Sequence, residues 1–534
     1  MKNTTELKQN LAKIIRFAIK PITCQPAFFI LLCVFLVVPD LYSRILRLSA
    51  FKVALELTVC YLLAFPVPFL PSLCRKIYKA ITLLSALFVY TIDIFLLLLY
   101  NASFGSNKSV ASAILATNPA EAQEYMDVYI TADRILIVLV LISIPILFSY
   151  YLRKSGFQFN IRARKVLATL LFVSITITIV KCDKIKDSNL YYLLTKECPN
   201  LCKYRQNPDV VCSGESVGDI VVIIGESYSK YNSSLYGYDK ETTPLLRSMR
   251  DDNNLFVYEN ATSACLTTIP AIKSIMMAYA DNMSDSIEWY NCLTLIEVMQ
   301  KAGYKTYWLS NQSKTGVYDN EVGRFAELCD EACFVGDKHS GLDRNNKDEE
   351  LLPVLEKCLS DTTDTGSPKF IIMQLMGSHA EYSRRYPSSF SKFNASDYNV
   401  SHSHLSSENR DILAKYDNSV LYNDYVVYEL MKRLEKEDAF VAYFSDHGQD
   451  VFNSSDDYAG HATSSARSKQ VACAIPFMVY TTSLFQEKHP SLQNKIETST
   501  YKKFCTDIVM YTIMDVAGVE TVNGISYKHK SLFK

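Results

Sequence analysis

The first third of the chain consists of long apolar runs separated by short polar and basic segments. Five of these runs are long enough to cross a bilayer, which takes about 20 mostly apolar residues in a helix. They lie at about 26–46, 52–71, 77–100, 134–152 and 166–182. A cleavable signal peptide is shorter and stands alone, so the first run is interpreted as a retained helix. The pattern therefore predicts a transmembrane domain over residues 1–182 with about five helices.

Lysine and arginine gather before the first run, between the second and third, and between the fourth and fifth. These residues are Lys2, Lys8, Lys13, Arg16, Lys20, Arg75, Lys76, Lys79, Arg153, Lys154, Arg162, Arg164 and Lys165. Basic loops stay in the cytoplasm, so five crossings place the amino terminus there and the chain after the last run outside it. Arg44, Arg47 and Lys52 are exceptions on the external side. Residues 101–134, between the third and fourth runs, are expected to form a membrane-surface helix or a polar loop.

Beyond residue 217 the pattern changes to short strands and helices that alternate along the chain. Strands are predicted at 219–225, 254–259, 305–310, 369–376, 438–445 and 473–481, and helices at 294–303, 346–361, 416–437 and 503–517. This alternation predicts an α/β domain over residues 217–534, with a mostly parallel sheet between helices. Residues 183–216 then form a linker. The irregular stretch at 378–406 is long enough to be an active-site loop.

The net charge indicates which partners are unfavourable, and the positions of the cysteines indicate where disulfides are permitted. The formal net charge of -1 argues against a nucleic-acid partner. Eleven of the fifteen cysteines lie from Cys182 onward, in the part placed outside the cytoplasm, where disulfides are permitted. Cys329 and Cys333 are spaced to close a short loop. A metal site built from thiolates is the alternative, and the lack of any CxxC pair disfavours it.

Two predicted strands end in residues suited to chemistry. Glu226 follows the strand at 219–225, and Asp446 and His447 follow the strand at 438–445. Ligands of open α/β sheets collect beyond the carboxyl ends of strands, and Gly448 permits the turn that brings both residues to one side. Two carboxylates and an imidazole suit Zn²⁺. A helix-capping or solvated glutamate is the alternative interpretation of Glu226.

A catalytic zinc ion keeps one coordination position open, and a hydroxyl near Thr268 is a candidate to fill it. Thr268 stands just before Pro270, at the expected start of a helix. A helix amino terminus favours a bound phosphate, and metal coordination activates a threonine hydroxyl as a nucleophile. The alternative is that Thr268 only caps this helix.

Several short motifs, in this order and spacing, together resemble one family. They are Gly225-Glu226-Ser227, Tyr236-Gly237-Tyr238 with Thr243-Pro244-Leu245-Leu246, the threonine segment, Ala302-Gly303-Tyr304-Lys305-Thr306 before Ser310-Asn311-Gln312, Met376-Gly377-Ser378-His379, Tyr416-Asp417-Asn418 and Ser445-Asp446-His447-Gly448. Nearly the whole chain resembles the phosphoethanolamine transferases of bacterial envelopes. Their soluble domain has an alkaline-phosphatase or sulfatase-like fold.

The resemblance implies roles for individual residues. It implies that zinc, one or two ions, is bound by Glu226, Thr268, Asp446 and His447, that Thr268 is the nucleophile, that His379 and His461 bind phosphate or a second zinc, and that Lys314 and Asn311 contact the substrate. An alignment anchored differently places Cys265 or Thr267 in the position of the nucleophile. Thr268 is preferred because its Thr-Ile-Pro context resembles the core-modifying branch of the family. His402 and His404 are interpreted as bystanders.

The resemblance also implies a reaction and a location. Phosphoethanolamine would pass from phosphatidylethanolamine through a phospho-threonine to a lipid A or core sugar of lipopolysaccharide, or to another envelope glycan. The chain would lie in the bacterial inner membrane, with its catalytic domain in the periplasm. A phosphoglycerol transferase or phosphodiesterase on the same fold and an inactive envelope sensor or scaffold are alternatives. A sulfatase activity is disfavoured, since Cys265-Leu266-Thr267 lacks the Pro and Arg that a sulfatase nucleophile motif contains.

Overall fold

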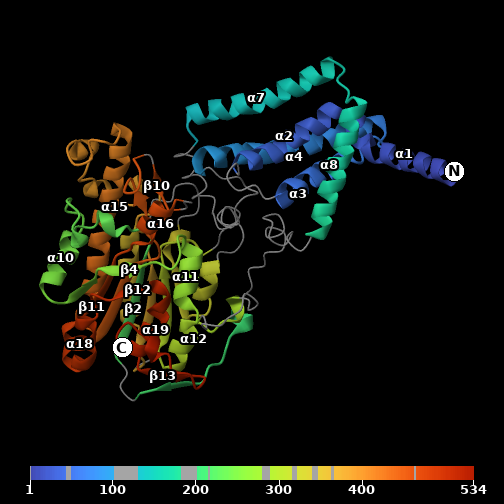
Figure 1. The fold of residues 1–534 in the computed structure, drawn as a ribbon. Coiled ribbons are helices and arrows are strands. Elements are labelled where there is room, and N and C mark those ends of the chain that lie inside the picture. Colours follow the sequence, from blue (N-terminus) through green and yellow to red (C-terminus); the bar gives the residue numbers. More distant parts are fainter. Residues whose placement is uncertain are drawn as a thin grey trace. The chain divides into compact units, whose positions relative to one another are not determined.

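The computed structural model describes most of the chain and groups it into two compact units (Figure 1). One unit contains the helices before residue 181, and the other is the α/β unit from residue 201 onward. The residues described are 2–43, 50–100, 130–181, 201–213, 217–278, 289–314, 321–338, 347–361, 366–456, 458–461 and 465–534.

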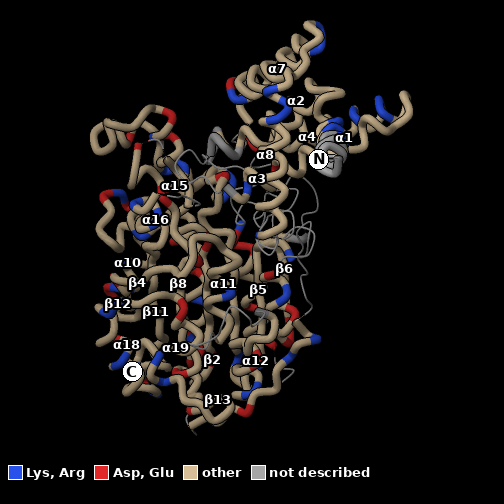
Figure 2. Tube along the Cα trace, turned by 45° about the vertical axis from the view of Figure 1, so that its right-hand side comes forward, with Lys and Arg blue, Asp and Glu red and all other residues tan. Residues whose placement is uncertain are grey.

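The first unit is entirely helical. Its described helices are α1 (Lys2–Thr23), α2 (Pro26–Ser43), α3 (Ala50–Ala64), α4 (Ser72–Tyr100), α7 (Ala132–Lys154) and α8 (Ile161–Val180). Leu32, Phe35 and Cys60 are buried between them. Figure 2 marks the positions of lysine and arginine along this unit in blue, and Arg153 and Lys154 end α7.

By length and composition, three helices in the described residues can cross a membrane, and a fourth if the bent pair α1–α2 is one span. The run predicted at 52–71 folds as α3, which has 15 residues and is shorter than a span. Five spans are therefore not confirmed. The expected surface helix falls mostly on residues 101–129, which lie outside the described residues.

The second unit is built on a seven-stranded sheet with the order β3-β11-β8-β2-β7-β5-β6. The strands are β2 (Asp219–Gly225), β3 (Leu255–Tyr258), β5 (Lys305–Ser310), β6 (Glu331–Phe334), β7 (Lys369–Gln374), β8 (Ala439–Ser445) and β11 (Phe477–Thr481). β11 is antiparallel to both of its neighbours, and all other neighbouring strands are parallel. The sheet is thus mixed and mostly parallel, as the alternation of elements predicted.

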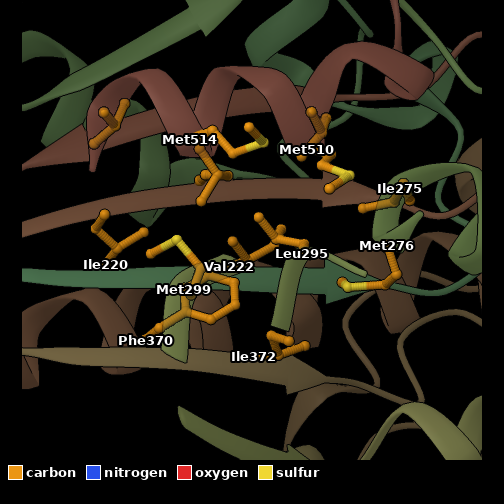
Figure 3. Close-up of a cluster of buried hydrophobic side chains, with 14 of the residues drawn as sticks. Ile220, Val222, Ile275, Met276, Leu295, Met299, Phe370, Ile372, Met510 and Met514 are labelled. Atoms are coloured by element: carbon orange, nitrogen blue, oxygen red, sulfur yellow. The ribbon is translucent and has the colours of Figure 1, made fainter. Parts of the chain in front are cut away.

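The apolar run of β2 is continuous because helices cover both faces of the sheet. Ile220 and Val222 pack on one face against α11 (Thr268–Met276), α12 (Leu295–Lys301) and α19 (Val509–Val516), as Figure 3 shows for part of this core. Val221 and Ile223 pack on the other face against α10 (Pro244–Asp251), α14 (Leu351–Leu359) and α15 (Ser407–Arg433). Fully burying each such side chain contributes about 1.5–3 kcal/mol, which fixes β2 as the central strand.

Shorter elements surround this core. They are β1 (Val210–Cys212) with β13 (Val519–Val522), β4 (Asn260–Thr262) with β12 (Lys503–Cys505), β9 (Asp450–Val451) with β10 (Ala459–Gly460), and the helices α13 (Glu321–Ala326), α16 (Ala466–Cys473), α17 (Ser483–Lys488) and α18 (Pro490–Thr498). Residues 210–212 of the predicted linker thus form a strand of this unit. Cys329 and Cys333 are not joined by a disulfide.

The predicted elements differ most from the structure at three places. The helix predicted at 416–437 begins at Ser407, where the side chain of Ser406 caps it. The strand predicted at 473–481 begins at Phe477, because α16 occupies the residues up to Cys473. The helix predicted at 503–517 starts as strand β12, which pairs with β4. Such pairing joins distant segments, so local periodicity does not reveal it.

The helical turns of the predicted loop at 378–406 are all short 3-10 turns. The buried carboxylate of Asp417 on α15 holds this loop in place through a hydrogen bond. Asp417 accepts hydrogen bonds from the hydroxyls of Tyr398 in this loop and Tyr238, at 2.5 and 2.7 Å, and from the amide of Asn232 at 2.8 Å. Burial raises the pKa of Asp417 to about 7, although these three donors work in the opposite direction.

This raised pKa predicts a pH-dependent stability. The ordinary pKa is 3.8, so the folded state holds the proton of Asp417 more tightly than the unfolded state does. The contribution of this proton is complete below pH 3.8 and is lost as the pH rises through about 7. We expect the thermal unfolding midpoint of the wild type, relative to Asp417→Asn, to fall over this range and to level off above it. A difference that stays constant with pH would show that the pKa of Asp417 is the same in the folded and the unfolded state.

Candidate metal centre and active site

Glu226, Asp446 and His447 meet at the carboxyl ends of two adjacent strands. β2 and β8 run parallel, with Gly225 opposite Ser445, so the residues that follow each strand emerge side by side. One ligand atom from each of the three residues lies within 4.8 Å of the others, and all three residues are buried. The structure therefore brings together the protein ligands that the sequence suggested for zinc.

The turns after these strands are shaped by close contacts. Ser227 has a φ of 56°, in the left-handed region, which lets its hydroxyl donate to Glu226 Oε1 at 2.8 Å and its amide donate to Asp446 Oδ1 at 3.3 Å. Gly377, with a φ of 51°, packs against the Glu226 backbone, where an added Cβ would lie 2.7 Å from the carbonyl oxygen. The end of β7 is thus pressed against Glu226, and a larger residue at this glycine would displace it.

Thr268 is the first residue of α11, and its hydroxyl is directed at the cluster. Thr268 Oγ1 donates to Glu226 Oε2 at 3.0 Å and lies 3.5 Å from His447 Nε2. Thr267 occupies the N-cap position and makes no side-chain cap hydrogen bond. The Cys265 thiol lies near the thiols of Cys505 and Cys473, and burial raises its pKa. Of the three candidates for the nucleophile, Thr268 is the residue whose hydroxyl contacts the metal-type ligands.

The cluster holds two carboxylates beside one imidazole with little solvent. Burial and the charge of Glu226 raise the pKa of Asp446 to about 8. Burial alone lowers the pKa of His447, but the charges of Asp446 and Glu226 outweigh it and raise this pKa to about 9. For Glu226 burial raises the pKa, and His447 outweighs it, so the net shift is downward. The imidazole alone does not balance two carboxylates, and a cation at this position would.

The residues present fit a divalent metal ion. Asp446 Oδ2 is buried and lies 3.5 Å from His447 Nε2, but it accepts no hydrogen bond from the described part of the chain. A buried carboxylate oxygen without a hydrogen bond is costly, and a metal ion would satisfy it. Two carboxylates and a histidine with a hydroxyl beside them form the donor set of a catalytic zinc site with one position open.

The predicted substrate-binding residues fall into two groups. The ring of His461 lies 4.2 Å from that of His447, between ring centres, and His379 is close enough for its charge to act on Glu226 and His461. Asn311 is buried, and its amide is turned to Asp348 at 2.7 Å. Lys314 Nζ lies 3.8 Å from Glu327 Oε1. The two histidines therefore belong to the cluster, whereas the amide and the lysine are engaged with neighbouring acidic residues.

Two amide side chains of the site did not emerge from the sequence. Gln312 Nε2 donates to Glu226 Oε2 at 3.2 Å, and Gln449 Oε1 lies 2.8 Å from His461 Nδ1. Both follow strand ends, β5 and β8, so their positions were available as a signal. An amide is not a usual zinc ligand, so the chemistry of a zinc site does not single out Gln312 or Gln449 in the sequence.

The chain combines helices long enough to cross a membrane with an α/β unit, and the α/β unit holds a buried cluster of metal-type ligands beside the Thr268 hydroxyl. These features are typical of a membrane-attached enzyme that carries out metal-assisted chemistry. Residues 219–519 match the sulfatase family, and the chain belongs to this family. Phosphoethanolamine transferase EptC of Escherichia coli is 26% identical over 448 residues, which cover 77% of this chain and 75% of EptC. Phosphoethanolamine transferase CptA of Salmonella typhimurium is 27% identical over 446 residues, with the same two coverages.

Solved structures agree with this relationship. The periplasmic domain of Escherichia coli EptC in complex with Zn is 26% identical and superposes with a TM-score of 0.53, covering 62% of this chain and 90% of that one. Lipooligosaccharide phosphoethanolamine transferase A of Neisseria meningitidis, an integral membrane protein, shares the fold with a TM-score of 0.64 at 17% identity, covering 95% and 97%. The predicted relationship and enzyme class, a phosphoethanolamine transferase, are confirmed. The chain is a membrane protein with a soluble C-terminal domain.

Proposed function

We propose that this chain transfers phosphoethanolamine from phosphatidylethanolamine to lipopolysaccharide, at lipid A or a core sugar, or to another envelope glycan. One observation carries the proposal: the Thr268 hydroxyl donates to Glu226 within a buried cluster of two carboxylates and a histidine. The names of the relatives support phosphoethanolamine as the transferred group. The names of these relatives do not specify the lipid donor or the acceptor, which are therefore our own proposal.

Glu226, Asp446 and His447 would hold a zinc ion, with the Thr268 hydroxyl beside it. The donor set and the Asp446 oxygen without a hydrogen bond support this assignment, as does the Zn complex of the EptC domain. When bound, zinc supplies a Lewis acid that favours the alkoxide form of a hydroxyl and offsets charge on phosphoryl oxygens. His379 and His461 would bind those oxygens or a second zinc ion.

The reaction would proceed by two displacements at phosphorus. Thr268 Oγ1 gives up its proton and attacks, the bond from phosphorus to the diacylglycerol oxygen breaks, and that oxygen takes up a proton, which leaves phosphoethanolamine on the threonine. The acceptor hydroxyl or phosphate then attacks the same phosphorus and gives up its proton, and Thr268 Oγ1 leaves and takes up a proton to become a hydroxyl again. The N–H groups at the start of α11 would face the transferred group. Lys314 would contact the substrate. Asn311 would contribute through Asp348, because Asp348 accepts hydrogen bonds from the side-chain amide of Asn311 and from the backbone N–H of Gly377. Gly377 in turn packs against the backbone of Glu226.

We further propose the division of the chain and its location. Residues 1–182 would form a transmembrane domain with about five helices, residues 183–216 a linker, and residues 217–534 a periplasmic catalytic domain. The bacterial inner membrane would keep this domain beside its lipid donor. The apolar helices of the first unit and the full-length fold match support the membrane attachment.

The donor is tested by trapping the covalent intermediate. The purified full chain with zinc is incubated with phosphatidylethanolamine or with phosphatidylglycerol, and its peptides are analysed by mass spectrometry. We expect a phosphoethanolamine adduct on the peptide that contains Thr268, and no adduct from phosphatidylglycerol. A phosphoglycerol adduct would instead identify a phosphoglycerol transferase. A chain that binds no zinc and forms no adduct would favour an inactive sensor or scaffold.

A further inference from the structure

One buried amide connects three separate segments at the edge of the active site. Gln449 Oε1 lies 2.8 Å from His461 Nδ1, and Gln449 Nε2 donates to the Tyr382 hydroxyl oxygen at 2.6 Å. Gln449 follows the Asp446-His447-Gly448 turn, and His461 follows β10. Tyr382 belongs to the long loop and stands three residues after His379. The Gln449 amide therefore contacts His461 directly and also contacts the loop that carries His379, and both histidines are proposed to bind the substrate.

The hydrogen bond at Nδ1 decides how His461 faces the site. An imidazole has two ring nitrogens, and the one that donates fixes the role of the other. Nδ1 donates to the amide oxygen, which leaves Nε2 as the ring nitrogen available to the site. The ring is held beside that of His447, with 4.2 Å between ring centres. Without the amide, the ring could rotate about its side-chain bonds.

The backbone already places these residues without help from the amide. β9 begins at Asp450, the residue after Gln449, and pairs with β10, where Gly460 lies opposite Asp450. This pairing fixes residues 449 and 461 as neighbours through main-chain contacts. The side chain of Gln449 is thus free to serve the orientation of His461 rather than the fold.

We propose that Gln449 is a positioning residue that fixes the ring orientation of His461 and, through Tyr382, holds the loop that carries His379. This rests on the proposed function only in that the two histidines are taken to meet the transferred group. A supporting residue of this kind is known from metal sites, where removing it typically costs about 10–100-fold in affinity or activity.

A labelling experiment tests the orientation without turnover. Diethylpyrocarbonate is added to the full chain, and the rate of modification of each histidine is followed by mass spectrometry of peptides. In Gln449→Leu, which removes the hydrogen bond at similar size, we expect His461 to be modified faster than in the wild type, because the ring is no longer held and Nδ1 becomes available to the reagent in addition to Nε2. In Gln449→Glu, which keeps an acceptor, the rate stays close to that of the wild type. His404, which lies outside the site, is the internal control and keeps its rate in all variants.

A double-mutant cycle tests the same idea in the reaction. The rate of adduct formation is measured for the wild type, Gln449→Leu, His461→Ala and the combined variant. If Gln449 acts through His461, the first substitution slows the reaction about tenfold in the wild type and has little effect once His461 is absent. Gln449→Glu should recover most of the rate. Tyr382→Phe tests the other end of the amide and should slow the reaction less than Gln449→Leu.

The outcomes separate this inference from the proposed function. Equal labelling of His461 in the wild type and Gln449→Leu would overturn the positioning role, and so would fully additive effects in the cycle. If the wild type forms no adduct, the proposed function fails, and the labelling still decides the role of Gln449. Thermal unfolding midpoints identify a variant that has lost its fold, and if Gln449→Leu has lost it, Tyr382→Phe against the wild type carries the comparison.

Discussion

Replacing Thr268 with alanine is expected to abolish the covalent adduct and to lower the rate of headgroup transfer by at least about a thousandfold. The Thr268 hydroxyl is the group that donates to Glu226 at 3.0 Å and lies 3.5 Å from His447. Alanine keeps the start of α11 but offers no atom that can take up the phosphoryl group. The loss would appear in the rate of the reaction and not in the zinc content, since Glu226, Asp446 and His447 remain.

Neighbouring residues provide matched controls for this substitution. Thr267→Ala removes a hydroxyl one residue earlier, at an N-cap position whose side chain makes no cap hydrogen bond. Cys265→Ala removes the other candidate nucleophile. Both variants should still form the adduct on Thr268, and Thr268→Ser should form it more slowly than the wild type. An adduct that persists in Thr268→Ala, or disappears in Thr267→Ala, would move the nucleophile to another residue while leaving the class of reaction intact.

Asp446→Asn is expected to weaken zinc binding by at least about a hundredfold without lowering the stability of the metal-free protein. The carboxyl group is buried beside Glu226, and its Oδ2 lies 3.5 Å from His447 Nε2 without accepting a hydrogen bond from the described residues. In the absence of a cation its ionised form is unfavourable, which raises its pKa to about 8, and an amide of the same shape avoids this cost. The site therefore gives up stability in the metal-free state in order to bind a cation tightly.

Thermal unfolding with and without a chelator checks this prediction. Removing zinc should lower the unfolding midpoint of the wild type, because an ion bound to the folded state stabilises it by mass action. The unfolding midpoint of Asp446→Asn should not change when zinc is removed.

Asp424→Asn is the control for this substitution. The Asp424 carboxylate is also buried, but it accepts hydrogen bonds from the backbone amides of Leu245 and Leu246 at the start of α10. It should lose about 1 kcal/mol of stability and keep its zinc. Unchanged zinc affinity in Asp446→Asn would contradict the assigned metal centre.

The sequence by itself determined the elements that carry the chemistry. The bounds predicted for β2 and β5 are those of the structure, because a continuous apolar run ends where its burial ends. Glu226 and the Asp446-His447 pair follow such runs directly, so their position at the edge of the sheet is a local property. The threonine before Pro270 was likewise visible as the start of a helix, and the structure begins α11 at Thr268.

Only the tertiary structure decided which of these residues meet and what supports them. The register that sets Gly225 opposite Ser445 makes Glu226 and Asp446 neighbours, and the fold of α11 onto the sheet adds the Thr268 hydroxyl. The pairing of β12 with β4, and the amide of Gln449 between His461 and Tyr382, leave no periodic trace in the chain. Periodicity reports how one segment is buried, whereas contacts between distant segments depend on packing that no single segment encodes.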